Sequence, residues 1–272
     1  MTLLISWIGV DSKKEGDSVA SLYIASDSRY TWGKNKYDYG IKVFGSAIFP
    51  DIFGFCGDVI FPSIVLGQLI PQIDCGLLFA PNDNCDVKHS KVLNFIGTSL
   101  DSYPKEHLNG MFTILHGTRS GKTFKCFKIN IDSEYNLLSE EIYLPLISKK
   151  VFSGGSGKKE FDYNYMSWEN EKHNDYRTSR GVYHCLEDTL IKIKDPNTGG
   201  KPQIVGLYRI GTCRLFGIVC DRKRYIYGKE CFDGENLDKI EWRNENFERI
   251  NPENLELVES AQRQPTYKEA TP

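Results

Sequence analysis

The hydrophobic period of this sequence changes several times along the chain, and these changes constrain the fold more than any other feature. Short segments rich in β-branched and aromatic residues come first, at 3–10, 21–26, 41–44 and 48–55. The polar stretch 11–18 between the first two is expected to be a long hairpin loop. Apolar residues then recur at helical spacing over 58–73 and 86–100, where Asp86 is the expected N-cap.

The second half of the chain repeats this alternation. Between later groups of segments with strand character, 177–194 is the clearest helix, since Val182, Leu186 and Ile193 belong to one apolar face. The connections leave no room for βαβ crossovers, so the order predicts an α+β fold with antiparallel sheets. The later strands are expected at 111–116, 123–131, around 141–144, 203–211, 215–220 and 224–227.

The composition changes after residue 232. From Asp233 onward the sequence is polar and lacks a regular period, apart from a short helix predicted near 254–261. We therefore divide the chain into a folded domain, 1–232, and a polar, partly disordered C-terminal extension, 233–272.

Charge and cysteine usage exclude several classes of function. With 34 basic and 36 acidic residues, the chain has a formal net charge of −2 and no overall attraction for nucleic acid or an anionic membrane. The apolar run 3–10 is too short for a signal peptide or a membrane span. Eight scattered cysteines favour reduced thiols, and only Cys85 with His89 has a spacing typical of metal ligands. We expect a cytoplasmic protein that binds no metal ion, cofactor, nucleic acid or membrane.

One glycine-rich segment is similar in sequence to a phosphate-binding loop but does not match its spacing. Gly117 to Thr123 ends in Gly-Lys-Thr, but three residues separate its glycines where the P-loop has four. The residues that follow have β character, whereas a P-loop leads into a helix. A hairpin turn is the better interpretation.

Thr2, directly after Met1, is the first candidate for chemistry. Removal of Met1 would leave an α-amine and a hydroxyl on one residue, which is a nucleophile that carries its own base. An α-amino group titrates at about 7.7 to 8.0, so a useful fraction is unprotonated near neutral pH. This signal is weak alone, because Thr2 also fits the plain opening of a strand.

Two further segments supply charged partners. At the end of the second strand Asp27, Arg29 and Thr31 alternate, so on an extended chain they share one face. Lys42 lies in the otherwise apolar run 41–44, where a lysine is costly to bury unless it is paired. It either extends to solvent or faces Asp27.

Six motifs occur in order over roughly residues 2–220. They are Thr2, the A-x-D-x-R-x-T-x-G stretch 25–33, Lys42-Val43, Phe55-Cys56-Gly57-Asp58, the G-S-G loop within 152–157, and Asp195-Pro-Asn-Thr198-Gly-Gly. In this order they resemble the proteasome β-subunit family of N-terminal-nucleophile hydrolases, which includes the bacterial peptidase that partners a ring-shaped, ATP-driven unfoldase.

The resemblance implies a four-layer αββα sandwich and a threonine-type peptidase. By this resemblance Thr2 is the nucleophile, Lys42 held by Asp27 keeps the amine available as a base, and the Gly57 N–H stabilises the oxyanion. Hydrogen bonds to the N-terminal residue would come from Ser156, Asp195 and Thr198. The substrate would contact Arg29, the main chain around Thr31, and Phe55 as a pocket wall.

The resemblance also implies a polypeptide substrate, a homo-oligomeric ring and an ATP-dependent unfoldase as partner. Three departures are a longer first hairpin loop, Thr198 where the family has serine, and an aromatic and charged stretch at 161–177. None removes a catalytic group, and activity requires that Met1 is removed. Two alternatives stay open: a catalytically silent scaffold with this fold, and a hydrolase of small or cyclic amides.

Overall fold

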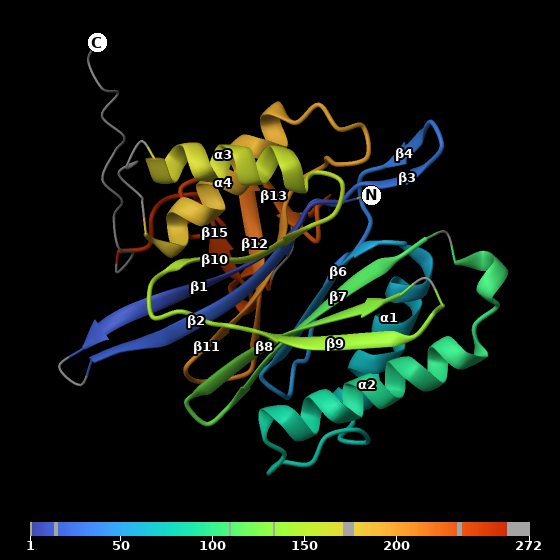
Figure 1. Ribbon diagram of the computed structural model, residues 1–272. Helices are drawn as coiled ribbons and strands as arrows, with labels where there is room; N and C mark the ends of the chain where they lie inside the picture. Colours follow the sequence, from blue (N-terminus) through green and yellow to red (C-terminus); the bar gives the residue numbers. More distant parts are fainter. Residues whose placement is uncertain are drawn as a thin grey trace.

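Two antiparallel β-sheets packed face to face form the centre of the protein (Figure 1). The computed structural model describes residues 2–13, 16–108, 110–132, 134–170, 177–232 and 236–259. Four α-helices occur within these residues, so the predicted α+β class with antiparallel sheets is confirmed.

The larger sheet has eight strands in the order β10-β1-β2-β11-β12-β13-β14, and β15 pairs with β12 in parallel. The smaller sheet has the order β5-β6-β7-β8-β9, and a separate hairpin joins β3 to β4. The bounds in the larger sheet are β1 Leu4–Lys13, β2 Gly16–Ser26, β10 Lys149–Gly154, β11 Gln203–Tyr208, β12 Cys213–Cys220, β13 Lys223–Ile226, β14 Lys229–Glu230 and β15 Glu241–Arg243. Elsewhere they are β3 Tyr30–Trp32, β4 Asn35–Tyr37, β5 Val43–Gly45, β6 Asp51–Gly57, β7 Phe112–Ser120, β8 Thr123–Ile131 and β9 Leu137–Ile142.

The central strands are buried on both faces, because side chains of a strand point alternately to opposite sides. In β1, Leu4 and Ile8 pack between the two sheets, against residues such as Ile52 and Leu115 of the smaller sheet. Ile5 of the same strand belongs instead to the core under the helices of the larger sheet. This double burial explains why 3–10 is a continuous apolar run.

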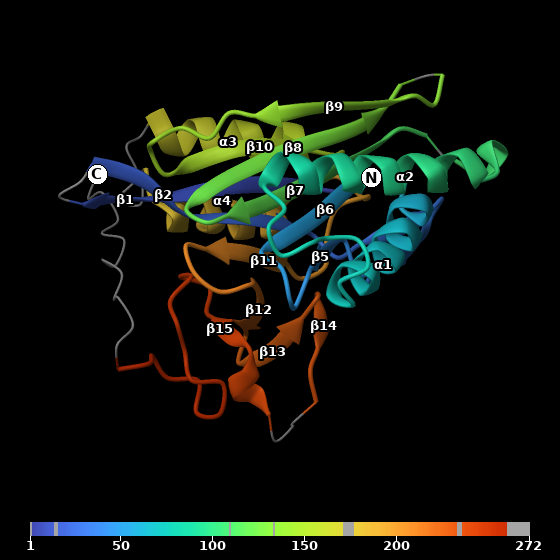
Figure 2. The ribbon, with the colours of Figure 1, turned by 90° about the horizontal axis from the view of Figure 1, so that it is seen from below.

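The helices cover the outer faces of the sheets. Helices α1 (Ile60–Asp74) and α2 (Cys85–Ser102) pack on the smaller sheet, and α3 (Lys158–Asn170) and α4 (Ser179–Lys192) on the larger one (Figures 1 and 2). Short 3-10 turns lie at Lys105–His107 and Leu237–Lys239. Among the helices of the described residues, none is both long and apolar enough to cross a membrane.

Several local predictions need correction. The polar stretch 11–18 is not a long loop, because β1 continues to Lys13 and β2 starts at Gly16, paired residue to residue. Main-chain hydrogen bonds between the two strands stabilise the extended conformation there, although the side chains are polar. The cap of α2 is Asn84, whose side chain accepts a hydrogen bond from Val87 N, and not Asp86. The β3–β4 hairpin, from Tyr30 to Tyr37, was not among the predicted strands.

Two turns agree with prediction. Ser120 pairs with Thr123 across Gly121, whose φ is +57°, so the Gly-Lys-Thr segment is a hairpin turn. Asp221 and Arg222 join β12 to β13 with φ values of +52° and +61°, the backbone of a two-residue hairpin.

The segment after residue 232 joins the fold more closely than its composition suggests. β15 extends the larger sheet, Trp242 is buried against Gly217, and Phe247 lies in the core beneath α4. The helix predicted at 254–261 is wrong for the described part, where Leu257 instead forms a β-bridge with Ile250. Residues 233–235 and 260–272 lie outside the described residues, and the division at 233 stays a prediction.

A chain of buried polar groups ties α2 to the smaller sheet. The Asp51 carboxylate accepts a hydrogen bond from Lys88 Nζ at 2.7 Å and pairs with His116 Nε2 at 3.0 Å. His116 Nδ1 lies 3.1 Å from His89 Nδ1, and His89 Nε2 lies 2.7 Å from Ser139 Oγ. The carboxylate only accepts, so His116 Nε2 donates to it. With both imidazoles neutral, His89 Nδ1 then donates to His116 Nδ1, and His89 Nε2 accepts from Ser139 Oγ. Burial lowers the pKa of both histidines, and the pKa of His89 falls to about 3.

We expect this pair to make the protein sensitive to acid. In the unfolded chain His89 takes up a proton below its ordinary pKa near 6.5, whereas the folded chain does so only near 3. The stabilisation is therefore complete above pH 6.5 and is lost as the pH falls toward 3, by up to about 1.4 kcal/mol per pH unit for each histidine. Urea unfolding between pH 7.5 and 5 measures this slope. His89→Gln should flatten it, and an identical slope in the variant would contradict this account.

Candidate active site

Thr2 lies two residues before the first residue of β1, and its side chain is fully buried. Its φ angle is +99°, an outlier for a β-branched residue, of the kind that costs about 1–3 kcal/mol. The carbonyl oxygen of Thr2 accepts a hydrogen bond from Gly157 N at 3.2 Å. Within the described residues Thr2 Oγ1 has no hydrogen-bond partner. A strained residue with a buried, unused hydroxyl is typical of a functional site.

The G-S-G loop approaches Thr2 so closely that only glycine fits. Gly155 has a φ of +89°, and a Cβ there would lie 2.0 Å from the carbonyl oxygen of Thr2. A Cβ on Gly157 would meet Thr198 Oγ1 at 3.0 Å. These two glycines hold Ser156 beside the start of β1.

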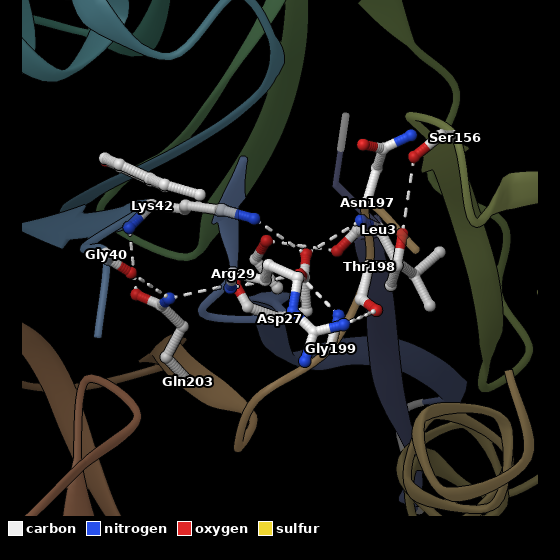
Figure 3. A network of polar contacts seen from close by, with 12 residues as sticks. Leu3, Asp27, Arg29, Gly40, Lys42, Ser156, Asn197, Thr198, Gly199 and Gln203 are labelled. Atoms are coloured by element: carbon white, nitrogen blue, oxygen red, sulfur yellow. Dashed lines mark hydrogen bonds and ion pairs between the residues drawn. The ribbon is translucent and has the colours of Figure 1, made fainter. Parts of the chain in front are cut away.

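Asp27 accepts four hydrogen bonds at the end of β2 (Figure 3). Its Oδ1 accepts from Leu3 N at 2.8 Å and from Lys42 Nζ at 2.9 Å. Its Oδ2 accepts from Arg29 N at 3.1 Å and from Gly199 N at 3.0 Å. Asp27, at the end of β2, therefore joins the start of β1 to two segments that are distant in sequence, those of Lys42 and Gly199.

Lys42 pairs with Asp27 and does not extend to solvent. Both side chains are 0% exposed, which decides between the two alternatives left open by the sequence. Burial lowers the pKa of Lys42, and the carboxylate of Asp27 opposes this change. Lys42 Nζ also lies 5.7 Å from the centre of the Tyr30 ring, within the range of a cation–π contact.

The other predicted hydroxyl and carboxylate groups meet beside the G-S-G loop. Thr198 Oγ1 donates to Asp195 Oδ2 at 2.8 Å, and Ser156 Oγ lies 3.4 Å from Thr198 Oγ1. Burial alone would raise the pKa of Asp195, but hydrogen bonds from Ser156, the main chain of Asn197 and Thr198 outweigh it and lower the pKa. Asp195 is thus held as a carboxylate near the start of β1.

Gly57 ends β6 with a φ of +97°, and a Cβ there would lie 2.2 Å from the carbonyl oxygen of Met111. Only glycine fits this close approach. Phe55 is fully buried, and its ring stacks on Phe44 within the core under α1. Phe55 N also donates to Lys42 O at 3.0 Å. Phe55 therefore supports the Lys42 segment, and its role as a pocket wall stays a prediction.

The guanidinium of Arg29 contacts two separate segments of the chain. It donates to both carboxylate oxygens of Asp38, at 2.7 and 2.8 Å, and to Thr198 O at 3.1 Å. The hydrogen bond with Asp38 is the main reason why the pKa of Arg29 is raised. Arg29 thus joins Asp38 to the 195–199 segment. Thr31 is buried in the first strand of the β3–β4 hairpin.

Sequence reasoning missed Gln203, the first residue of β11. Its Oε1 accepts from Lys42 N at 2.9 Å, and its Nε2 donates to Asp27 O at 3.0 Å and to Gly40 O at 2.9 Å (Figure 3). Gln203 is 1% exposed, so these contacts replace water for four main-chain groups, the fourth being Val43 N at 3.4 Å. Its partners are main-chain atoms, which no residue pattern could have indicated.

No protein-family model matches this chain, and no curated protein matches it significantly.

Gln203 offers a test of this geometry. Gln203→Met keeps the size of the side chain but leaves buried N–H and C=O groups unpaired, at about 1–3 kcal/mol each. We expect urea unfolding to show a loss of about 3 kcal/mol or more, and faster exchange of the Lys42 and Val43 amide hydrogens. The control Gln72→Met, on an exposed position of α1, should change stability by less than about 0.5 kcal/mol. Equal stability of the two variants would show that Gln203 does not bind the two segments together.

Proposed function

We propose that this protein is a threonine-type peptidase, an N-terminal-nucleophile amide hydrolase that uses Thr2 after Met1 is removed. One observation carries the proposal: the carboxylate oxygen that accepts Lys42 Nζ also accepts the N–H of Leu3, the residue after Thr2. A buried cation is thereby held beside the N-terminal residue. Burying two charges is costly, and the pair supports the proposal because it lies beside the start of β1 and not because it is buried.

The proposed fold is the four-layer αββα sandwich of this class of hydrolases. Three hydrophobic clusters support it, one between the two sheets and one beneath each pair of helices. The candidate residues lie at the ends of strands in both sheets, so the packing of the sheets sets their distances.

The proposed chemistry needs two groups on Thr2. Thr2 Oγ attacks the scissile carbonyl, the amine takes the hydroxyl proton directly or through a water, and the amine then protonates the leaving group. Lys42 places a positive charge nearby, which disfavours protonation of the amine and keeps it available as a base near neutral pH. The Gly57 N–H would stabilise the oxyanion, a contribution of about 3 kcal/mol. Water hydrolyses the resulting ester.

The strained backbone of Thr2 supports processing at this position. A φ angle describes the rotation of a residue relative to the peptide before it. Cleavage of the Met1–Thr2 bond removes that peptide, and with it a strain of about 1–3 kcal/mol. The amine that remains would lie near the carboxylate of Asp195 and the hydroxyls of Ser156 and Thr198, which we propose hold it in one orientation.

The remaining parts of the proposal concern assembly. We propose a polypeptide substrate that binds as an extended strand, a homo-oligomeric ring and an ATP-driven unfoldase as partner, all suggested by the motif resemblance. Main-chain pairing would make affinity depend little on substrate sequence. Light scattering of the native particle separates a ring from a small amide hydrolase of low oligomeric order.

The test combines intact mass with labelling by a threonine-directed epoxyketone, which requires both the amine and the hydroxyl of an N-terminal threonine. We expect the wild-type chain to lose Met1 and gain one adduct, and Thr2→Ala to lose Met1 without gaining an adduct. Thr198→Ser, which keeps the supporting hydroxyl, should label within about threefold of the wild-type rate. A processed wild-type chain that stays unlabelled would exclude the peptidase.

A further inference from the structure

A second concave site lies beside the candidate active site and does not depend on the proposed function. Its volume is about 800 Å³, within the range of small-molecule sites. The segment 200–202 before β11, the last turns of α4 and the β12–β13 turn form part of its wall. Gly200, next to the Gly199 that binds Asp27, lines it.

The walls combine apolar surface with carboxylates. Leu190, Ile191 and the rings of Tyr39 and Tyr225 line the cavity, and Ile191 is 81% exposed. Exposed aliphatic and aromatic groups around a cavity favour a ligand with an apolar part. Five acidic residues and one lysine also line it: Asp38, Glu187, Asp221, Glu230, Glu245 and Lys201.

Three of these carboxylates already have a cation. Asp38 pairs with Arg29, Glu230 with Lys223 at 2.9 Å, and Asp221 with Lys201 at 3.2 Å. Lys201 Nζ is also 2.9 Å from Cys220 Sγ, which holds this ammonium at the β12–β13 turn.

Glu187 and Glu245 differ from the other three. Across the described residues, neither carboxylate has a cation within ion-pair distance. Glu187 accepts a hydrogen bond from the hydroxyl of Tyr183 at 2.6 Å, and Glu245 accepts one from Asp221 N at 3.2 Å. Within the described part of the chain, the cavity therefore contains two acidic side chains that form no ion pair.

The pKa of Glu187 is raised, as expected for a largely buried carboxyl group with other carboxylates nearby. Burial and the charges of Glu245 and Asp221 raise the pKa of Glu187, and the hydroxyl of Tyr183 and the ammonium of Lys201 oppose them. The resulting pKa is about 8, so Glu187 is mostly protonated at pH 7. A positive charge entering the cavity would reverse this and release the proton.

We propose that this cavity binds an organic cation, an alkylguanidinium or alkylammonium group that pairs with Glu187 and Glu245 while its apolar part packs on Leu190 and Tyr225. The aromatic ring of Tyr225 suits a cation, since Lys201 Nζ already lies 5.3 Å from its centre. Both a small diamine and a basic side chain of a peptide carry this chemistry.

Calorimetric titration of the full chain at pH 7 tests the proposal with agmatine and with the blocked peptide acetyl-leucyl-arginine amide. We expect at least one to bind and to release nearly one proton, seen as a dependence of the measured heat on the ionisation enthalpy of the buffer. Tighter binding of agmatine identifies a small amine, and tighter binding of the peptide identifies a basic side chain. The matched peptide with citrulline, a neutral isostere of arginine, should bind at least about tenfold more weakly.

Variants locate the site. Glu187→Gln should weaken binding about tenfold or more and abolish proton release, and Glu245→Gln should also weaken it. Glu140→Gln, in the other sheet, should leave binding within about twofold. Thr2→Ala should bind like the wild type, which separates this site from the proposed peptidase. Absence of binding by both probes, equal binding of the citrulline peptide, or unchanged binding by folded Glu187→Gln and Glu245→Gln would overturn the proposal.

Discussion

The carboxylate of Asp27 is the interaction on which the rest of the candidate site depends. It accepts from the main chain of Leu3, Arg29 and Gly199 and from the ammonium of Lys42. A buried ion pair is stable only when further hydrogen bonds satisfy its charges, and three N–H donors fulfil this need for Asp27. The same bonds fix where β1 begins, and so fix the position of Thr2.

Neighbouring residues make this arrangement rigid. Gln203 binds the main chain on both sides of the pair, and Arg29 joins Asp38 to the 195–199 segment. The proposed cation cavity shares this support, because Gly200 and Asp38 form part of its wall. The candidate active site and the proposed cation cavity thus meet at the short segment Gly199-Gly200.

The sequence predicted much of the fold, because most strands and helices have their own hydrophobic period. It was wrong where tertiary contacts outweigh composition, as in 11–18, where cross-strand pairing extends β1 and β2 through polar residues. β15 was missed because three residues carry too little pattern, and Trp242 is buried only when it meets Gly217.

The sequence likewise indicated some residues of the candidate site and not others. The pairing of Lys42 with Asp27 was one of two alternatives that the sequence left open, because a lysine in an apolar run is costly to bury unless it is paired. Gln203 could not be predicted, since its contacts are with the main chain. The proposed cation cavity could not be predicted either, because α4, the segment 200–202, the β12–β13 turn and Glu245 meet only after folding.

The pKa of Lys42 is the most direct test of the central claim that a buried lysine is held beside the N-terminal residue by Asp27. It can be followed by NMR of lysine labelled at Cε and Nζ, with Lys42→Met to assign the signal. The account predicts a Lys42 pKa below the ordinary value of 10.5, because burial outweighs the attraction of Asp27. A Lys42 signal that titrates at or above 10.5, as that of a solvent-exposed lysine would, would contradict it.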